Sequence, residues 1–412
     1  MPEKNSVLAI IGQGYVGLPL AMAAVDAGWR VIGVDNSDER VVSLNRGVSH
    51  IEDVSGHQIK SALSAGLYTA TNVFSDIASA DVVAICVPTP LDLDRKPNLQ
   101  PLLSAVRSIE PHVKKGAVVV SESTSYPGTL RNVIIPIFEE GLGLINREVF
   151  FAAAPERVNP GDQVWNQKNT PRLVGGLNSK SQAKALGFYN SICDSVISVA
   201  SPEIAEAGKL LENTFRLVNI ALIHEFTQMC DSESIDVNQV IDAASTKPYG
   251  FMPFRPGVGI GGHCIPVDPL YLTWWANQNG KTASLVQLAD EVSSAMPNYV
   301  ANRVMMLAPK QVDKVKVLLL GVAYKAGVGD VRETPAKALK EHLQNRGCVV
   351  HWHDPLVETW ENSNSVDISW ECDVAVVVTN QPGIDIKHLS KKGVPILDCT
   401  NSFPGLSGVT LI

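Results

Sequence analysis

Three glycines near the start of the chain constrain its fold more than any other feature. Gly12, Gly14 and Gly17 have the spacing GxGxxG, and they directly follow the β-branched run 7–11. A strand, a tight glycine turn and a helix whose first N–H groups point outward form the arrangement that holds the pyrophosphate of a dinucleotide. The uncharged stretch 5–25 around these glycines is as long as a membrane span, but three glycines and a glutamine make a poor apolar helix. We therefore predict a strand, a turn and a helix here, and no signal peptide or membrane anchor.

Short β-branched runs alternate with longer amphipathic stretches through the first half of the chain. This rhythm predicts β-α-β units around a parallel sheet, with strands buried on both faces. The strands predicted here span residues 7–11, 31–34, 82–87, 118–120 and 150–154. The rhythm returns toward the C-terminus, without a second GxGxxG, and predicts strands at 315–320, 349–352, 374–378 and 396–397.

The middle of the chain follows a helical period. Ser201-Pro202-Glu203 is typical of a helix start, with a capping hydroxyl, a proline at the first position and an acid in the first turn. Apolar residues then recur at intervals of three, four or seven, which predicts a helix over 202–230 with one packed stripe. The stripe consists of Ile204, Leu211, Phe215, Val218 and Leu222.

These patterns together predict the fold class and the domain boundaries. We expect an α/β protein in which two Rossmann-like, doubly wound parallel-sheet domains are joined by a central all-helical domain containing the long helix. The expected domains are residues 1–200, 201–300 and 301–412.

The composition excludes several classes of protein. Hydrophobic residues make up 45% of the 412 residues, which is enough to build a core and excludes a disordered or disulfide-stapled chain. There are 34 Lys and Arg against 42 Asp and Glu, a net charge of −8, which argues against nucleic acid or an anionic membrane as a partner. The seven cysteines include no CxxC pair and no Cys/His cluster, so we expect no metal site and a reducing, cytoplasmic setting.

The second predicted strand indicates which dinucleotide is bound. Asp35 ends this strand, where a carboxylate can accept hydrogen bonds from both hydroxyls of a ribose. Its negative charge would repel a 2′-phosphate, so the sequence favours NAD over NADP as the cofactor. The alternative is a glycine turn without any ligand.

A loop rich in proline and glycine carries the most informative cysteine. Residues 248–269 contain five prolines and five glycines, which predicts an irregular, functional loop rather than a helix or strand. Within it, Cys264 follows Gly261, Gly262 and His263, so that a substrate can approach the thiol closely. The alternatives are that Cys264 is a small buried apolar residue and that Asp268, a candidate general base, merely caps a helix. A Cys/His pair with His263 is disfavoured, because adjacent side chains point apart.

Four other polar residues are candidates for the site because of their positions in the predicted elements. Thr124 and Glu156 follow predicted strands, and the carboxyl ends of parallel strands are where open α/β sheets bind ligands. Lys209 and Asn213 lie four apart on the predicted long helix and share a face, although such a pair can also be plain solvated surface.

Two cations follow the first strand of the C-terminal region. Lys325 and Arg332 stand among glycines, where they suit a diphosphate. Alternatively, they form surface ion pairs with Asp330 and Glu333.

With these motifs in order, the chain resembles the nucleotide-sugar 6-dehydrogenase family, also called the UDP-glucose/GDP-mannose dehydrogenase family. The motifs that carry the resemblance run through nearly the whole chain: residues 12–20, 87–90, 122–124, 155–157, 209–213, 261–266, 324–325 and 330–333. The motif 261–266, the run from Asp268 to Trp274 and the run 246–251 are most similar to the UDP-N-acetyl-D-glucosamine 6-dehydrogenase branch.

The resemblance implies a four-electron oxidation of a sugar C6 alcohol to the uronic acid, with two NAD reduced to NADH. Cys264 would add to the intermediate aldehyde as a thiohemiacetal, which is oxidised to a thioester and hydrolysed by water. Lys209 and Asn213 would stabilise the oxyanion, Asp268 and Thr124 would position or activate water, and Glu156 would assist acid/base steps.

The resemblance also implies the binding residues and the assembly. The expected NAD contacts are Gly12, Gly14, Tyr15, Val16, Gly17, Asp35, Arg40, Thr89 and Thr124. The expected contacts to the nucleotide sugar are Glu156, Arg157, Lys209, Asn213, Arg255, Gly261, Lys325 and Arg332, with the last two in a UDP-binding C-terminal domain. The central domain would form a homodimer, in which Arg255 could reach the neighbouring site. Gln13, an unusual residue between the first two glycines, is expected to point outward.

UDP-N-acetylglucosamine is the substrate that the motifs favour. UDP-glucose, UDP-N-acetylmannosamine and UDP-N-acetylgalactosamine stay open, because a single amide contact decides which C2 substituent is accepted. A two-electron β-hydroxyacid dehydrogenase would share the Lys-x-x-x-Asn pair but would leave Cys264 without a task. A different class of protein, a non-catalytic sensor of NAD or nucleotide sugar, would bind without turnover.

Overall fold

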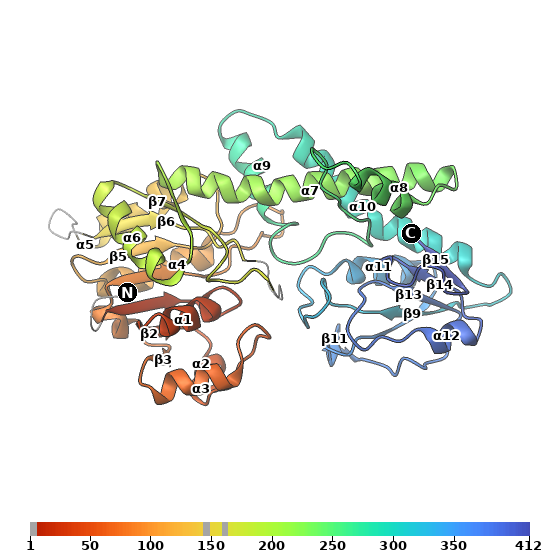
Figure 1. Ribbon diagram of the computed structural model, residues 1–412, viewed down its shortest axis with the longest axis horizontal. Coiled ribbons are helices and arrows are strands. Elements are labelled where there is room, and N and C mark those ends of the chain that lie inside the picture. Colours follow the sequence, from red (N-terminus) through yellow and green to blue (C-terminus); the bar gives the residue numbers. More distant parts are fainter. Residues whose placement is uncertain (1–5, 143–148, 159–163) are drawn as a thin grey trace. The chain divides into compact units, whose positions relative to one another are not determined.

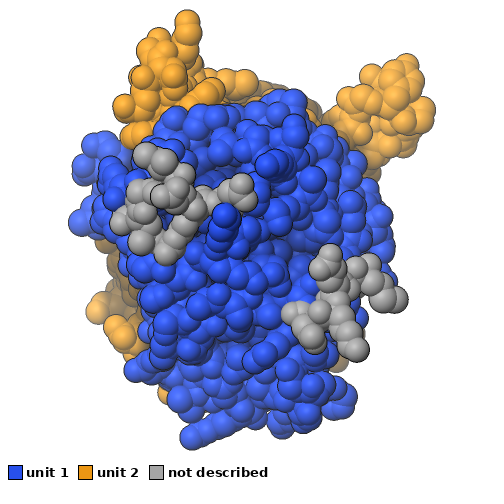
Figure 2. Space-filling model, turned by 90° about the vertical axis from the view of Figure 1, so that its left-hand side faces the viewer, with its two compact units in different colours: residues 1–212 blue, residues 213–412 orange. Residues whose placement is uncertain are grey.

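The computed structural model describes residues 6–142, 149–158 and 164–412, and the chain divides into two compact units (Figures 1 and 2). Unit 1 comprises residues 1–212 and unit 2 comprises residues 213–412. The boundary falls within one continuous helix, α7 (Pro202–Ser232), which confirms the long helix predicted over 202–230. Each unit has its own sheet and its own core, and the division into three domains stays a prediction.

Unit 1 is built on one eight-stranded sheet with the strand order β3-β2-β1-β4-β5-β6-β7-β8. All neighbouring strands are parallel except β6 and β7, which are antiparallel. The strands are β1 (Val7–Ile11), β2 (Arg30–Val34), β3 (Tyr68–Thr71), β4 (Val82–Ile85), β5 (Val118–Ser121), β6 (Phe150–Ala153), β7 (Arg172–Gly176) and β8 (Val196–Val199). The five predicted strands are confirmed, whereas β3, β7 and β8 were not predicted. Threonines alternate in β3, β7 begins with an arginine and ends in two glycines, and β8 is only four residues long.

Helices cover both faces of this sheet (Figure 1). In β1, Leu8 and Ile10 pack into a cluster with α1, α3 and α6, and Ala9 and Ile11 pack into a second cluster with α4 and α5. Alternate strand residues therefore face opposite helical layers, which confirms the doubly wound prediction. The helices are α1 (Gly17–Asp26), α2 (Asp38–Asn45), α3 (Gly56–Ser64), η1 (Phe74–Ser79), α4 (Gln100–Ile109), η2 (Glu110–His112), η3 (Leu130–Ile134), α5 (Ile135–Leu142) and α6 (Ser179–Ile192).

Unit 2 combines helices with a five-stranded parallel sheet of order β10-β9-β13-β14-β15. After α7 come α8 (Val237–Ser245), α9 (Asp268–Gln278), α10 (Ser284–Leu307), α11 (Pro335–Asn345) and α12 (Lys387–Lys391). The strands are β9 (Lys316–Leu320), β10 (Val349–His353), β13 (Val374–Val377), β14 (Ile396–Asp398), β15 (Val409–Leu411) and the small hairpin β11 (Thr359–Trp360) and β12 (Ser363–Asn364). The four strands predicted in this region are confirmed. None of the helices in the described ranges combines the length and the apolar composition that a bilayer crossing requires.

The turns after β1 and β9 share one device, although only the first carries GxGxxG. Gly12 and Gly321 both have positive φ, and a Cβ on them would lie 2.6 Å and 1.9 Å from a backbone carbonyl oxygen. An aspartate at the end of the neighbouring strand accepts a backbone N–H of each turn, Asp35 from Gln13 and Asp354 from Val322. The C-terminal sheet therefore repeats the strand–turn geometry of the N-terminal sheet.

The prediction of a packed stripe on α7 is wrong for four of its five residues, since only Val218 packs, partly buried, against a core cluster. Ile204, Leu211, Phe215 and Leu222 are exposed by 49%, 67%, 47% and 59%. The cores are instead reached by Ala205, Leu210, Leu217 and Ala221, whose small or offset side chains lie on another face of the helix. Periodicity identifies an apolar face, but it does not show what covers that face.

The proline- and glycine-rich loop is confirmed. The chain between α8, which ends at Ser245, and α9, which begins at Asp268, contains no helix or strand. It carries Cys264.

Candidate active site

The three glycines of the first turn have three different roles. Gly12 adopts a φ of 95°, which favours glycine, and a Cβ on Gly17 would lie 1.9 Å from the Gly12 carbonyl oxygen. A Cβ on Gly14 would meet nothing within 4 Å, so this glycine borders open space that a pyrophosphate can enter. Val16, at the capping position of α1, supplies no side-chain acceptor, as expected where a phosphate takes that place. Tyr15 and Val16 pack against the apolar core.

The expectation that Gln13 points outward is wrong. Its side chain is 0% exposed. The Nε2 group donates to the carbonyls of Ile10 (3.1 Å) and Gly12 (3.2 Å), and Oε1 accepts from the Tyr68 hydroxyl (2.8 Å). Gly33 makes the room, because a Cβ there would lie 2.4 Å from Gln13 Oε1. The glutamine side chain thus ties the glycine turn to β1 and β3 by hydrogen bonds and packs closely against Gly33 of β2.

Asp35 lies where the sequence predicts it, at the end of β2. Its carboxylate is buried and accepts the backbone N–H groups of Gln13 (2.9 Å) and Ser37 (3.0 Å). Arg40 Nη1 lies 2.9 Å from Asp35 Oδ2, so these two expected NAD contacts form one ion pair. Thr89 is buried in the segment that follows β4. The turn and the oriented carboxylate fit a dinucleotide whose ribose carries no 2′-phosphate.

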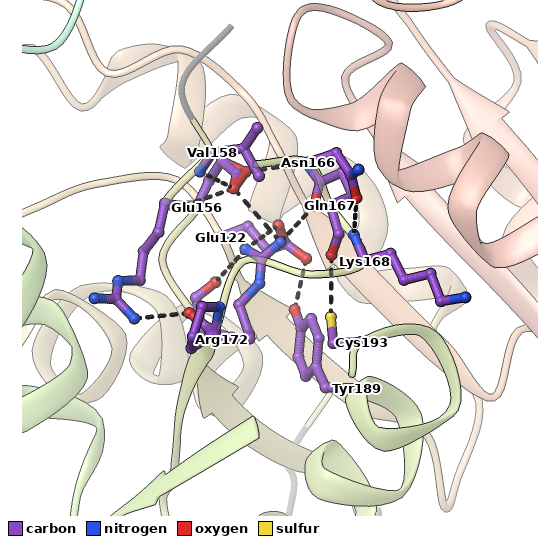
Figure 3. Close-up of polar contacts among 12 residues, drawn as sticks. Glu122, Glu156, Val158, Asn166, Gln167, Lys168, Arg172, Tyr189 and Cys193 are labelled. Atoms are coloured by element: carbon purple, nitrogen blue, oxygen red, sulfur yellow. Dashed lines mark hydrogen bonds and ion pairs between the residues drawn. The ribbon is translucent and has the colours of Figure 1, made fainter. Parts of the chain in front are cut away.

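The ends of β5 and β6 hold two buried glutamates around one arginine (Figure 3). Glu156 Oε1 accepts the Val158 N–H (2.6 Å), and Glu156 Oε2 accepts the amide of Gln167 (3.1 Å). Arg172 Nη2 lies 3.6 Å from Glu156 Oε1. Burial opposes ionisation of Glu156, but Arg172, the Val158 N–H, Lys209 and Gln167 together hold its pKa below the ordinary value. Glu156 is therefore a carboxylate that hydrogen bonds hold in place and that the positive charges of Arg172 and Lys209 stabilise.

Glu122 is the second carboxylate of this group. It accepts a 2.5 Å hydrogen bond from the Tyr189 hydroxyl and a 3.1 Å hydrogen bond from Arg172 Nη1. Burial raises its pKa, against the pull of Arg172 and with the repulsion of Glu156. Sequence reasoning missed Arg172 and Tyr189. The available signal was a charged residue, Arg172, directly before the apolar pair Leu173 and Val174.

Thr124 lies in a turn that is fastened at both ends. Ser123 Oγ donates to the Val87 carbonyl (2.7 Å). The buried Glu206 carboxylate of α7 accepts the N–H groups of Gly128 (2.6 Å) and Leu130 (2.9 Å). Thr124 itself is partly exposed between these anchors. Glu206, which the sequence did not single out, therefore fixes the turn that carries a candidate catalytic threonine.

Asn213 and Asp268 form a buried pair in unit 2. The Nδ2 group of Asn213 donates to Asp268 Oδ2 at 2.5 Å. Asp268 is the first residue of α9, Val267 holds the capping position, and no side chain caps the helix there. The Asp268 carboxylate accepts this hydrogen bond from Asn213 at the first turn of α9. Lys209, one turn before Asn213 on α7, is also buried.

Cys264 differs from the other six cysteines. It alone is exposed, whereas five are buried and Cys372 is intermediate. Its carbonyl accepts the N–H of Asp268 at 2.8 Å, which ties the cysteine to the first turn of α9. The sequence alternative of a buried structural cysteine is therefore wrong. Burial and the Arg332 charge lower the pKa of His263, so this neighbour is a neutral imidazole.

The two glycines before Cys264 serve packing within unit 2. A Cβ on Gly261 would lie 2.7 Å from Tyr324 Cβ, and one on Gly262 would lie 2.8 Å from the Tyr324 ring. The Gly262 N–H also donates to the Arg332 carbonyl at 3.2 Å. Glycine is required here so that the cysteine loop can lie on the segment after β9, which carries the predicted nucleotide-sugar cations.

The remaining predicted substrate contacts have partners within the chain. Arg332 makes a bidentate ion pair with Asp330, at 2.6 Å for Nη2 to Oδ2. Arg157 pairs with Glu212 (2.7 Å) and donates to the Pro171 carbonyl, and Arg255 pairs with Asp242 of α8. Lys325 is partly exposed, and its carbonyl accepts from Gln381 (3.4 Å). Within the described ranges no three His, Cys, Asp or Glu side chains gather as metal ligands would.

Comparison with known proteins agrees with this geometry. Models of the UDP-glucose/GDP-mannose dehydrogenase family match residues 6–193 (NAD binding domain), 203–295 (central domain) and 318–403 (UDP binding domain). The chain is 34% identical to a UDP-N-acetyl-D-mannosamine dehydrogenase of Methanococcus vannielii over 87% of this chain and 82% of that protein. It is 35% identical to a UDP-N-acetyl-D-glucosamine 6-dehydrogenase of Pseudomonas aeruginosa over 86% and 84%.

A solved structure, that of the UDP-D-ManNAc dehydrogenase from Pyrococcus horikoshii, matches 98% of this chain and 99% of that chain, with a TM-score of 0.88 and 30% identity. The fold, the dinucleotide turn and these matches lead to one conclusion. The chain belongs to the UDP-glucose/GDP-mannose dehydrogenase family and is an NAD-dependent UDP-sugar 6-dehydrogenase.

Proposed function

We propose that the protein oxidises C6 of a UDP-N-acetylhexosamine to the carboxylate in two steps, through a covalent intermediate on Cys264. The observation that carries this proposal is that Cys264 alone of seven cysteines is exposed. It is anchored beside the buried Asn213–Asp268 pair. An exposed thiol next to an oriented acid and an amide donor is the set of groups that nucleophilic catalysis at a carbonyl requires.

The chain's residues then have the following tasks. The thiol of Cys264 adds to the C6 aldehyde, and the resulting thiohemiacetal is oxidised to a thioester. Lys209 and Asn213 donate to the oxyanion, while Asp268 accepts a proton from the water that hydrolyses the thioester and releases the thiol and the carboxylate. Bound NAD supplies the two-electron acceptor for each of the two oxidations.

UDP-N-acetylglucosamine is the first substrate to test, supported by the motif around Cys264 and by the relative from P. aeruginosa. UDP-N-acetylmannosamine is the second, because a relative named for that activity is 34% identical, against 35% for the relative from P. aeruginosa. The two sugars differ only in configuration at C2, so a pocket that holds the acetamido group decides between them.

The test is a panel of UDP-, GDP- and dTDP-sugars incubated with purified protein and NAD. The expected result is two NADH for each acid formed, from one UDP-N-acetylhexosamine in preference to UDP-glucose. One NADH per sugar with accumulating aldehyde would overturn the cysteine mechanism. Tight binding without any NADH would instead indicate the non-catalytic sensor.

We also propose a homodimer that is formed through the central helices. In unit 2, Phe215, Leu222 and Met229 of α7 repeat every seven residues and are exposed by 47%, 59% and 55%. An apolar row at this spacing on a long helix suits a second helix with the same row. Sedimentation should show a dimer that Leu222→Glu converts to monomer, whereas Leu356→Glu, at another exposed leucine, should stay dimeric. A wild-type monomer at micromolar concentration would exclude the dimer.

The protein is further proposed to act in the cytoplasm. This setting keeps the thiol of Cys264 reduced.

A further inference from the structure

Arg172 is a fully enclosed cation next to two candidate site segments, and the proposed reaction gives it no role. It is the first residue of β7, and its side chain is 2% exposed. Its guanidinium reaches Glu122 (3.1 Å), Gln167 Oε1 (2.6 Å) and Glu156 (3.6 Å) (Figure 3). A strand-initial arginine thus joins the segments that follow β5 and β6, where Thr124 and Glu156 are carried.

The charges around Arg172 do not balance pairwise. Two carboxylates share one guanidinium, and both carboxylates are buried. Buried ions are stable only when they are paired and hydrogen-bonded, so the two glutamates compete for the same positive charge. The competition is uneven, because Glu122 has the shorter contact to Arg172, whereas Glu156 also accepts two backbone N–H groups.

The other titratable groups that face this cluster are few. Tyr189 of α6 donates to Glu122, and Lys209 of α7 acts on Glu156. The Cys86 and Cys193 thiols are buried beside the cluster, and burial raises the pKa of both, so they are uncharged. Arg157 is directed to Glu212. Lys209 and Arg172 are therefore the two cations that set the charge of Glu156.

We propose that Arg172 is a positioning residue: shared between Glu122 and Glu156, it holds Glu156 in place as an ionised carboxylate at the end of β6. Glu122, as the competing partner, limits how much of the arginine's charge Glu156 receives. The opposite directions of the two glutamate pKa values, raised for Glu122 and lowered for Glu156, agree with this sharing. The inference rests on the proposed function only for its effect on turnover, since the charge sharing itself is a property of unit 1.

The sharing predicts that two substitutions move the pKa of Glu156 in opposite directions. Glu122→Gln removes the competitor and a like charge, so the pKa of Glu156 should fall further. Arg172→Gln removes the cation, so that pKa should rise by about one unit or more. The readout is carbon-13 NMR of protein labelled at the glutamate carboxyl carbon, with the Glu156 signal assigned by its loss in Glu156→Gln.

Kinetics provide the second readout. The acid limb of the pH profile of kcat/KM should move to higher pH in Arg172→Gln and to lower pH in Glu122→Gln, whereas a purely structural role would lower kcat/KM without these opposite shifts. If Arg172→Gln does not fold, Arg172→Lys provides the test. This variant keeps the positive charge but loses the planar guanidinium that reaches both glutamates, so the pKa of Glu156 should rise by a smaller amount. Arg303→Gln is the matched control, because Arg303 pairs with Asp231 in unit 2, and it should leave the Glu156 signal unchanged.

Shifts of Glu156 in the same direction for both variants, or no shift, would overturn the proposal. Opposite NMR shifts in a protein that forms no NADH with any UDP-sugar would sustain the charge sharing and overturn the proposed function. The two failures are therefore distinguishable.

Discussion

The hydroxyl of Tyr68 donates a 2.8 Å hydrogen bond to Oε1 of Gln13, a buried residue of the dinucleotide turn. Both side chains are buried, so Tyr68→Phe leaves this oxygen without its donor and should lower the free energy of unfolding by about 1–3 kcal/mol. The glycine turn should become less rigid, and the dissociation constant of NAD should rise about tenfold. Urea denaturation and NAD titration check both effects. Tyr299→Phe, which removes a hydroxyl bound to Asp231 in unit 2, should cost stability but leave NAD binding intact. Unchanged NAD affinity in Tyr68→Phe would refute the role of Gln13.

Asp35 should decide the choice of cofactor. Asp35→Asn keeps the shape of the side chain but removes the negative charge that repels a 2′-phosphate. It also removes one of the two carboxylate oxygens that accept hydrogen bonds from the ribose hydroxyls. NAD binding should weaken about 10- to 100-fold, since hydrogen bonds to charged groups contribute roughly 1.5–3 kcal/mol. The ratio of the affinity for NAD to the affinity for NADP should fall correspondingly. Fluorescence titration with both cofactors measures this, with Asp38→Asn on the next helix as the control. A preference that stays as in wild type would count against the ribose contact.

Cys264→Ala should stop the reaction before the acid. The first oxidation needs no thiol, so the variant should release aldehyde and at most one NADH per sugar, while NAD binding stays intact. Mass spectrometry of the products and NADH absorbance measure the result. Cys372→Ala removes the partly exposed cysteine of unit 2 and should behave like wild type. Acid production by Cys264→Ala at the wild-type rate would contradict the covalent mechanism.

Asp268→Asn should trap the acylated enzyme. The residue is buried 2.5 Å from Asn213, and its replacement removes the candidate base for hydrolysis. The turnover number should fall by about 100-fold or more, as is typical when general base catalysis is lost. Intact-protein mass spectrometry should then detect a sugar-nucleotide adduct on Cys264. Asp313→Asn, at an exposed acid of the same unit, serves as the control. Absence of the adduct at full activity would exclude a role in hydrolysis.

Glu206 should make the stability of unit 1 depend on pH near neutrality. Burial raises its pKa from the ordinary value of 4.5 to about 7, against the pull of the Leu130 and Gly128 N–H groups. Because the pKa is raised, the folded protein keeps the Glu206 proton at pH values where the unfolded chain has lost it. The stabilisation that this proton gives is therefore complete below about pH 4.5 and is lost as the pH rises through 7. The difference in unfolding free energy between wild type and Glu206→Gln should therefore decrease by about 3 kcal/mol from pH 4.5 to 8.

Urea denaturation at a series of pH values measures this dependence. Glu203→Gln is an informative control. The hydrogen bond from Arg131 lowers the pKa of Glu203, so its contribution should instead be lost as the pH falls. A wild-type minus Glu206→Gln difference that stays flat across neutral pH would show that Glu206 titrates normally.

Local patterns in the sequence were sufficient for much of the fold. The run 7–11, the three glycines after it and Asp35 identify a dinucleotide turn, because backbone conformation and strand order depend on neighbouring residues. The helix α7 and the irregular loop around Cys264 were predictable for the same reason, from the helical period and from the density of proline and glycine.

Only the tertiary structure decided which side chains are enclosed and by what. Gln13 lies inward because Gly33 and Tyr68, distant in sequence, leave a space that fits its amide. The apolar row of α7 is exposed although its period is that of a buried face. Arg172 joins Glu122 and Glu156 because β5, β6 and β7 are neighbours in one sheet. Periodicity and motifs encode local conformation, whereas burial and charge pairing arise from contacts between segments far apart in the chain, and these form only when the sheet assembles.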